Sequence, residues 1–437
     1  MGRWTARTYL AALCLLLALS LGTQAALGVA GGIGGIGEVG GAVSAGEGAS
    51  NATKESPTPG NTLISAQSYR NNGKLIEVTP AGEVVWEYVP ENSRVFDAEV
   101  LPNGNVQVAV ATRLPAAECP DRTLETRPKS CVYNRVQELD YGSKEVLWEY
   151  SWYDAYITHH EVHDADRLPN GNTAIIDMGN DCAFVVDREG ELVWEWKADT
   201  YLAPGSEFYE TYGGDPNPGG EADWTHMNDI DRLPSGNFQL SVRNFDGMIE
   251  VDRESKEVVE VYGRPGNHSL LYEQHNPDRL ADNETILVAD SENQRILEVD
   301  AEGTIGWKFG GKAVLTWPRN ADRLPDGDTL VTDSVDDRVI EVAPNGTIVW
   351  EYQGVALPYS ADRVGVPEES GGPVVGDTAE SRFEDAPIVG TVTEYASFAK
   401  FVLPTWVGTS ELLNAIALLA CGAWLLFATV RERYRSA

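Results

Sequence analysis

Short hydrophobic runs alternate with turn residues along most of the chain, and one phrase punctuates the alternation. A sequence close to DRLPNGN returns five times between residues 97 and 364. Self-similarity at a fixed period indicates a chain built from one repeated supersecondary unit. Departures from the repeat are therefore candidates for functional residues. The repeats begin at Asp97, Asp164, Asp229, Asn276 and Asn320.

Each unit predicts four short strands, and the unit that begins at His163 is the clearest. HDADRLP is a first strand, and NGN is a tight turn whose Gly and Asn tolerate positive φ. TAIID, FVVD and LVWEW follow as three more strands with alternating or β-branched apolar residues. Four strands in a unit of roughly 40 to 45 residues are typical of a β-propeller blade.

The ends of the repeat region predict how the ring closes. NTLIS from Asn61 matches the second strand of a blade, and VVWEY up to Tyr88 completes that blade. The missing first strand appears after the last full repeat, as SADRV from Ser360. Pairing an N-terminal piece with a C-terminal strand leaves no open edge. The sequence therefore predicts an all-β fold, a six-bladed β-propeller over residues 61–364.

The repeated phrase itself is interpreted as structural. Its Asp and Asn residues stabilise turns, its Leu packs between blades, and recurring tryptophans pack on the outer strands. These tryptophans include Trp194, Trp307 and Trp350.

An apolar segment precedes the predicted propeller. Residues 1–30 carry two arginines ahead of an apolar run and then small residues, which predicts a secretory signal peptide or, if it is not cleaved, an N-terminal membrane anchor. Residues 31–60 are predicted to form a Gly-rich, flexible linker.

A second apolar segment follows the propeller. After an acidic linker over 365–400, residues 401–437 contain a nearly charge-free stretch of bilayer length with three arginines directly behind it. This predicts a transmembrane helix and a short basic cytoplasmic tail. Because basic residues stay on the cytoplasmic side, the expected location is the cell membrane, with the propeller on the extracellular side.

The charge balance excludes one class of partner. The chain has 33 Lys and Arg against 67 Asp and Glu, a formal net charge of −34. Phosphate binding requires clustered basic residues, so no nucleic-acid partner is expected. The acidic residues are spread over all predicted blades, which favours a strongly hydrated, halophilic surface on which salt screens self-repulsion.

The cysteines fit an extracellular location. Cys119 and Cys131 bracket an insertion in the second blade and are expected to form a disulfide, which leaves Cys182 alone in the propeller. The same location permits glycosylation at the acceptor sequons of Asn51, Asn267, Asn283 and Asn345.

Polar or cationic side chains occupy one register position in successive units, three residues before the repeated Asp. Equivalent positions on the inner strands converge at one mouth of a propeller channel, so these side chains are expected to come together. The unit with an asparagine there also has a histidine, His226, two residues earlier. In chain order the register position holds His163, Asn228, His275 and Arg319.

A second break falls at the end of a second strand. Sister units carry an Asp-Ser pair there, beginning at Asp290 and Asp333, whereas the unit of His226 has Arg243. Imidazoles with an arginine suit a substrate that is anionic at its reacting centre, because the guanidinium offers a planar fork of donors. The alternatives are histidines that are packed or solvated and an Arg243 that forms an ordinary ion pair between blades.

The ordered set HDADRLPNGN, WTHMN, SVRN and EQHN resembles the arylsulfate sulfotransferases, six-bladed propellers outside the cytoplasm, and the likeness covers residues 61–364. The resemblance implies that His275 attacks the sulfur of an aryl sulfate and forms a sulfohistidine, from which a phenol accepts the sulfuryl group. It further implies that His226 and His163 bind sulfuryl oxygens or shuttle protons, and that Arg243 clamps the sulfate.

Further candidates for substrate contact are Asn228, Arg319 and His160, and either His160 or His163 fills the first histidine role. Small aryl sulfates and phenols are the expected substrates, with no cofactor or metal. The family's larger members carry an added N-terminal β-domain, where this chain has a short linker. Two other classes stay open: a non-catalytic propeller that binds a surface partner or polymer, and a quinoprotein or lactonase-type propeller.

Overall fold

The computed structural model describes residues 57–366 except 71, 156–158, 220–222 and 283, and parts of 371–427. The chain divides into two units, one of which, Ala42–Ala386, contains the propeller. In the other unit, α5 (Pro387–Phe398) is described.

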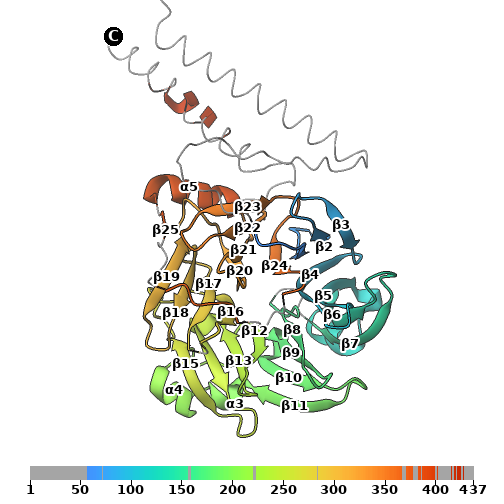
Figure 1. Ribbon diagram of the computed structural model, residues 1–437. Helices are drawn as coiled ribbons and strands as arrows, with labels where there is room; N and C mark the ends of the chain where they lie inside the picture. Colours follow the sequence, from blue (N-terminus) through green and yellow to red (C-terminus); the bar gives the residue numbers. More distant parts are fainter. Residues whose placement is uncertain are drawn as a thin grey trace, which may run out of the picture. The chain divides into compact units, whose positions relative to one another are not determined.

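Six sheets of antiparallel strands, one of them extended by a short parallel strand, form the six blades among the described residues (Figure 1). Blade 1 consists of β24 (Pro358–Arg363), β1 (Thr62–Ala66), β2 (Lys74–Val78) and β3 (Val84–Tyr88). Blade 2 consists of β4 (Ser93–Val100), β5 (Val106–Pro115), β6 (Ser130–Leu139) and β7 (Val146–Asp154). Blade 3 consists of β8 (Ala165–Arg167), β9 (Thr173–Asp177), β10 (Cys182–Val186) and β11 (Leu192–Lys197).

The remaining blades follow the same order from the inner strand outward. Blade 4 consists of β12 (Met227–Arg232), β13 (Phe238–Val242), β14 (Gly247–Val251) and β15 (Val258–Gly263). Blade 5 consists of β16 (His275–Arg279), β17 (Ile286–Asp290), β18 (Arg295–Val299), β19 (Ile305–Gly310) and the added β25 (Arg382–Phe383). Blade 6 consists of β20 (Pro318–Arg323), β21 (Thr329–Asp333), β22 (Arg338–Val342) and β23 (Ile348–Tyr352).

Short helices lie in the connections between these strands. They are η1 (Ala116–Glu118), α2 (Asp121–Thr126), η2 (Met178–Asn180), α3 (Ala198–Tyr201), α4 (Glu207–Tyr212) and η4 (Arg243–Phe245).

The ring closes as the sequence predicts. β1 pairs antiparallel with β24, so that Thr62 stands opposite Arg363. The labels of the six inner strands surround the centre of the ring in Figure 1. The all-β, six-bladed propeller is thereby confirmed. The parallel strand β25, which extends blade 5 next to β19, lies within the segment expected to be a linker.

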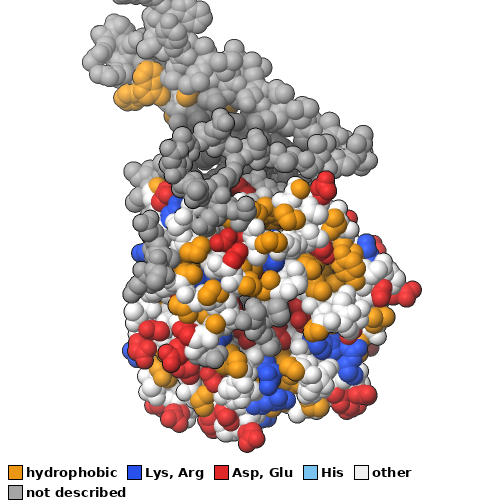
Figure 2. Space-filling model, in the orientation of Figure 1, with side chains coloured by type: hydrophobic (Ala, Val, Ile, Leu, Met, Phe, Trp, Pro, Cys, Tyr) orange, Lys and Arg blue, Asp and Glu red, His pale blue; other side chains and the backbone are white. Residues whose placement is uncertain are grey.

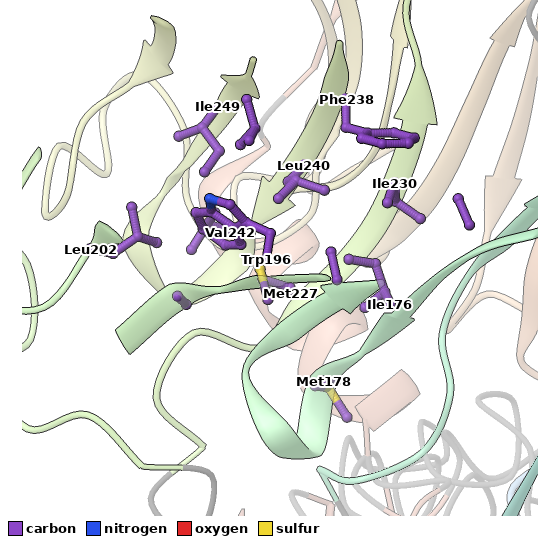
Figure 3. Close-up of a cluster of buried hydrophobic side chains, with 14 of the residues drawn as sticks. Ile176, Met178, Trp196, Leu202, Met227, Ile230, Phe238, Leu240, Val242 and Ile249 are labelled. Atoms are coloured by element: carbon purple, nitrogen blue, oxygen red, sulfur yellow. The ribbon is translucent and has the colours of Figure 1, made fainter. Parts of the chain in front are cut away.

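Hydrophobic clusters between adjacent blades form the core. One cluster joins blades 3 and 4, where Trp196 packs with Met227 and Leu240 (Figure 3). This arrangement follows from the two-residue period of the strands, which sends alternate side chains to opposite faces of each blade. Each blade therefore buries both of its faces against the two adjacent blades.

Tryptophan bonds also join neighbouring blades. A tryptophan of a fourth strand donates its indole N–H to a carbonyl in the turn between the third and fourth strands of the next blade. The bonds run from Trp86 to Tyr141 at 2.6 Å, Trp148 to Arg188 at 2.9 Å, Trp194 to Arg253 at 2.9 Å, Trp307 to Pro344 at 3.0 Å and Trp350 to Pro80 at 3.0 Å.

The excursion between β5 and β6 is held by a disulfide between Cys119 and Cys131, and Cys182 is buried and free. Two of the four sequon asparagines are described and exposed, Asn267 and Asn345, whereas Asn51 and Asn283 lie outside the described residues. Figure 2 shows Asp and Glu side chains spread over the visible face of the propeller, with Lys and Arg in smaller groups.

Several predictions on the chain ends lie outside the described residues. They concern the signal peptide or anchor at 1–30, nearly all of the linker at 31–60 and most of the segment 401–437. In the described part of the chain, no helix has the length and apolar character needed to cross a membrane. The membrane location and the extracellular side therefore stay predictions.

Candidate functional site

The inner strands bring one ring of side chains to the mouth of the channel. The ring occupies the register three residues before the repeated acidic residue and is buried. It consists of Phe96, His163, Asn228, His275, Arg319 and Tyr359. Ring centroids of His163 lie 4.6 Å from Phe96 and 5.5 Å from Tyr359, and the Arg319 guanidinium lies 5.5 Å from the Tyr359 ring. The predicted convergence of this register is therefore present in the structure.

His226 joins the ring from the turn that precedes β12. Its ring centroid lies 5.6 Å from that of His163. The backbone φ of His226 is 47°. The equivalent residues of the next two blades have similar positive values, 51° for Glu273 and 56° for Trp317. A left-handed conformation is uncommon for such residues and costs roughly 1 kcal/mol or more. The repeated turn therefore fixes where His226 points.

Hydrogen bonds determine the tautomers of two histidines. His163 Nδ1 lies 3.0 Å from the carbonyl of Glu161. His275 Nδ1 lies 3.2 Å from the carbonyl of Glu273 and 2.8 Å from Ser291 Oγ. A carbonyl oxygen can only accept, so Nδ1 carries the hydrogen in both rings. Nε2 of each ring then carries the lone pair.

Burial keeps these imidazoles neutral. It lowers the pKa of His275 well below its ordinary value, and the positive charges of Arg243 and Arg319 lower it further. Burial likewise lowers the pKa of His163, with a second contribution from His226. Neutral imidazole is the nucleophilic form, so both rings are available as bases or nucleophiles at neutral pH.

An aspartate bridges two further histidines. Asp223 Oδ1 lies 2.7 Å from His226 Nδ1, and Asp223 Oδ2 lies 3.2 Å from His159 Nδ1. Burial lowers the pKa of His226 to about 4, against the opposing hydrogen bond to Asp223. The ligand atoms of these three residues lie within 4.8 Å of one another, so the group has the donors to hold a metal ion.

Arg243 forms an ion pair between blades, the alternative considered from the sequence. It pairs with Glu273, two residues before His275, and donates to Asn244 Oδ1 at 2.9 Å. The ion pair thus holds the Arg243 guanidinium beside His275, the candidate nucleophile. The buried Nε–H of Arg243 has no hydrogen-bond acceptor among the described residues.

Arg319 is buried without a carboxylate partner. Its Nη1 donates to the neutral amide of Gln67 at 2.8 Å, and its guanidinium lies 4.3 Å from the ring centroid of Trp317. No ion pair of Arg319 occurs within the described residues, and its Nε lacks a hydrogen bond there. Burial lowers the pKa of Arg319 to about 10, so the side chain stays charged at neutral pH.

The histidine doublet is resolved by its contacts. His160 Nδ1 lies 2.9 Å from Asp154 Oδ1, whereas His163 lies against His226. His163 therefore takes the place at the channel mouth.

Asn228 donates from Nδ2 to the carbonyl of Gln274 at 2.9 Å and thereby joins β12 to the residue before His275.

Sequence reasoning missed several residues of this site. Tyr359 could have been found by extending the register to the closing strand. Ser291 stands in the Asp-Ser pair that was used only as a contrast to Arg243. Asp223 lies in a long connection without periodicity, so no sequence signal places it next to His226.

A family model described as Arylsulfotransferase (ASST) matches residues 51–276, just over half of the 437 residues. The chain belongs to the arylsulfotransferase family. The matched segment includes His163, His226, Arg243 and His275, whereas Arg319 lies beyond it. Membership of the arylsulfotransferases supports a transferase that acts on small molecules. No curated protein matches the chain significantly.

Solved structures resemble this chain only distantly. A protein of unknown function from Bacteroides caccae has 13% identity and a TM-score of 0.48, covering 70% of this chain and 98% of that one. The periplasmic gluconolactonase of Pseudomonas aeruginosa has 14% identity and a TM-score of 0.44, covering 70% and 99%. An inactive virginiamycin B lyase variant from Staphylococcus aureus with quinupristin has 13% identity and a TM-score of 0.41, covering 69% and 87%. These likenesses carry no argument about function.

Proposed function

We propose that the protein transfers sulfuryl groups from aryl sulfates to phenols, with His275 as the nucleophile. The observation that carries the proposal is the uncompensated charge of Arg319 next to neutral histidines. A buried guanidinium without a counter-ion is costly, and a bound anion removes that cost. The charge of Arg319 lowers the pKa of both His275 and His163, so it acts on both imidazoles.

The first half-reaction begins at His275 Nε2. Its lone pair attacks sulfur, the bond from sulfur to the aryl oxygen breaks, and a phenolate leaves with the bonding pair. Because Ser291 and the Glu273 carbonyl hold Nδ1–H, the ring presents Nε2 to the channel mouth. Arg319 and the free N–H of Arg243 stabilise the three sulfuryl oxygens as charge redistributes.

The second half-reaction restores the histidine. The hydroxyl oxygen of an acceptor phenol attacks sulfur, the bond between sulfur and Nε2 breaks, and the hydroxyl proton passes to a base. His163 and His226 are assigned this proton transfer, because their ring centroids lie 5.6 Å apart in an edge-to-face arrangement and both rings are neutral. The proton released by the acceptor balances the one that the departed phenolate takes up, so a full turnover leaves the pair neutral.

The test compares the wild type with His275→Ala and His275→Asn. Turnover of 4-nitrophenyl sulfate with phenol is measured in high salt, and mass spectrometry searches donor-treated protein for a sulfuryl adduct on His275. His268→Ala is the matched control, because His268 is an exposed imidazole of the neighbouring loop. We expect the His275 variants to lose transfer and adduct. Undiminished turnover by these variants would overturn the proposal. A folded wild type that transfers nothing from a broad donor panel would favour the non-catalytic binding propeller.

A further inference from the structure

Two histidines and an aspartate form a cluster beside the candidate catalytic ring. His159 comes from the connection before β8, whereas Asp223 and His226 come from the connection before β12. Asp223 Oδ1 lies 2.7 Å from His226 Nδ1, and Asp223 Oδ2 lies 3.2 Å from His159 Nδ1. The two imidazole rings stand edge to face, with their centroids 5.4 Å apart. One carboxylate thus faces a ring nitrogen of each histidine.

The spacing and the donor types of this cluster match a zinc site. One donor atom from each residue lies within 4.8 Å of the other two. Bonds of Zn²⁺ to nitrogen and oxygen place the ligand atoms of a tetrahedral ion about 3.3 Å apart, close to the separations in the cluster. Two imidazoles and one carboxylate are a ligand set that Zn²⁺ uses when water completes its coordination. Ca²⁺ and Mg²⁺ take oxygen ligands, so the two histidines disfavour them.

The connection that carries Asp223 and His226 is fastened to the blades on both sides. In blade 3, Asp181 accepts hydrogen bonds from the Thr225 backbone N–H at 3.1 Å and from the Thr225 hydroxyl at 2.5 Å. In blade 4, Asn244 donates from Nδ2 to the Asp223 carbonyl at 2.5 Å. The two ligand residues are therefore placed before any ion binds, which lowers the entropic cost of binding.

The nearest arginine does not make the surroundings of the cluster positive. Arg243 reaches the cluster through Asn244, which accepts from Arg243 Nη1 at 2.9 Å and donates to the Asp223 carbonyl. The Arg243 guanidinium is ion-paired with Glu273, so the pair brings no net charge. The negative charge of Asp223 then favours a cation between the two imidazoles.

We propose that His159, Asp223 and His226 bind Zn²⁺ at the channel mouth, with water completing the coordination. The ion changes which nitrogen of His226 carries the hydrogen. Without the ion, the Asp223 carboxylate accepts from His226 Nδ1–H, and Nε2 holds a lone pair. Zn²⁺ takes the lone pair of the nitrogen that it binds, so the hydrogen moves from Nδ1 to Nε2. The ring is neutral in both states.

This change of tautomer removes a base from the proposed reaction. His226 shares with His163 the uptake of the acceptor's proton, and an Nε2 that already carries a hydrogen cannot accept another. The ion therefore slows the second half-reaction and leaves the attack by His275 possible. Zinc binding is independent of the proposed transferase function, whereas this inhibition rests on it.

Calorimetric titration of the full chain tests the site. Untagged protein is stripped with chelator and titrated with ZnCl₂ in high salt, and metal analysis after dialysis counts the bound ion. We expect one Zn²⁺ per chain and no comparable binding of Mg²⁺. The absence of zinc binding would overturn the proposal.

His159→Ala removes one ligand, and because its side chain is 51% exposed the fold is not at risk. Substitutions of residues behind the ligands already weaken metal binding by about tenfold to a hundredfold, so loss of a ligand should cost about a hundredfold or more. His268→Ala is the matched control. His268 is 53% exposed and its Nε2 lies 3.2 Å from Asp246, but no third ligand joins this pair among the described residues. Equal zinc affinity of the wild type and His159→Ala would refute the site.

Transfer assays test the change in His226. In saturating Zn²⁺, the initial burst of 4-nitrophenol from 4-nitrophenyl sulfate should persist, while turnover with phenol should fall by about tenfold or more. His159→Ala should match the wild type in chelator and keep its rate in Zn²⁺. Full wild-type turnover with the site occupied would contradict the change of tautomer. Wild-type protein that is inactive even in chelator would count against the transferase alone, and the calorimetry would still decide the zinc site.

Discussion

Ser291 Oγ lies 2.8 Å from His275 Nδ1 and donates its own hydrogen to the Pro318 carbonyl at 2.7 Å. The hydroxyl therefore has only its acceptor side left for the imidazole. One serine thus links the inner strands of blades 5 and 6 and sets the tautomer of the proposed nucleophile.

Ser291→Ala is expected to lower kcat without a comparable change in KM. Removing a buried hydrogen bond of about 1 kcal/mol or slightly more corresponds to a rate loss of roughly tenfold. Steady-state kinetics check this, with Ser334→Ala as the control. Ser334 occupies the equivalent position of blade 6, and its buried Oγ has no hydrogen-bond partner among the described residues. Equal losses in the two variants would contradict a positioning role for Ser291.

Arg319→Met is expected to raise the KM for the sulfate donor by about tenfold to a hundredfold, because charged hydrogen bonds to the anion are lost. The folded state should not suffer, since the substitution removes a buried charge that lacks a counter-ion. Arg323→Met provides the contrast. It breaks the fully buried pair with Glu298 and should cost about 3 to 5 kcal/mol in the free energy of unfolding. Denaturant titration and donor kinetics separate the two effects.

The pH profile of transfer should lack the limb that an ordinary imidazole produces. The pKa of His275 is lowered by burial and by the positive charges of Arg243 and Arg319. The ring therefore stays neutral when pH falls below about 6.5, where a solvated histidine would take up a proton. Single-turnover rates with an aryl sulfate should hold through that range. A rate that halves near pH 6.5 would contradict a buried nucleophile.

The lowered pKa of His275 leaves the transfer rate unchanged below about pH 6.5, but it makes the folded state less stable there. Below about 6.5 the unfolded chain binds a proton at His275 that the folded chain does not, so folding becomes less favourable as pH falls. His275→Gln should flatten this dependence. Unfolding titrations between pH 7 and 5 measure it, and an unchanged slope in the variant would show that His275 is solvated.

Trp350→Phe should weaken the closure of the ring. The indole of Trp350 donates to the carbonyl of Pro80 at 3.0 Å and joins blade 6 to blade 1. Loss of one such bond costs about 1 kcal/mol, a fall in Tm of a few degrees. Trp194→Phe removes the matching bond between blades 3 and 4 and should have a similar effect. Differential scanning calorimetry compares the two.

The repeat carried most of what could be predicted about the fold. Its turns and its two-residue apolar period follow from local chemistry, so blade number and closure were accessible. The same register predicts that His163, Asn228, His275 and Arg319 lie close together. Tyr359 was missed because the closing strand was recognised only from Ser360 onward.

The contacts of residues outside the repeat could not be predicted from its register. Asp223 reaches His226 through a connection whose course depends on packing, not on period. Arg319 matters because it has no carboxylate partner among the described residues. The sequence does not predict this, because the partners of a buried arginine come from other blades. Sequence alone favoured Arg243, and the structure shows that Glu273 already neutralises much of its charge.

The pairing of β1 with β24 has a consequence for synthesis and folding. The ribosome makes β1 near the start of the propeller and β24 at its end, so blade 1 waits for the whole ring to be translated. Contacts this distant in sequence form slowly, and an uncovered β1 edge is exposed to aggregation meanwhile. β24 also delivers Tyr359 to the face of His163. A chain that ended before residue 358 would lose both the seal of the ring and one wall of the site.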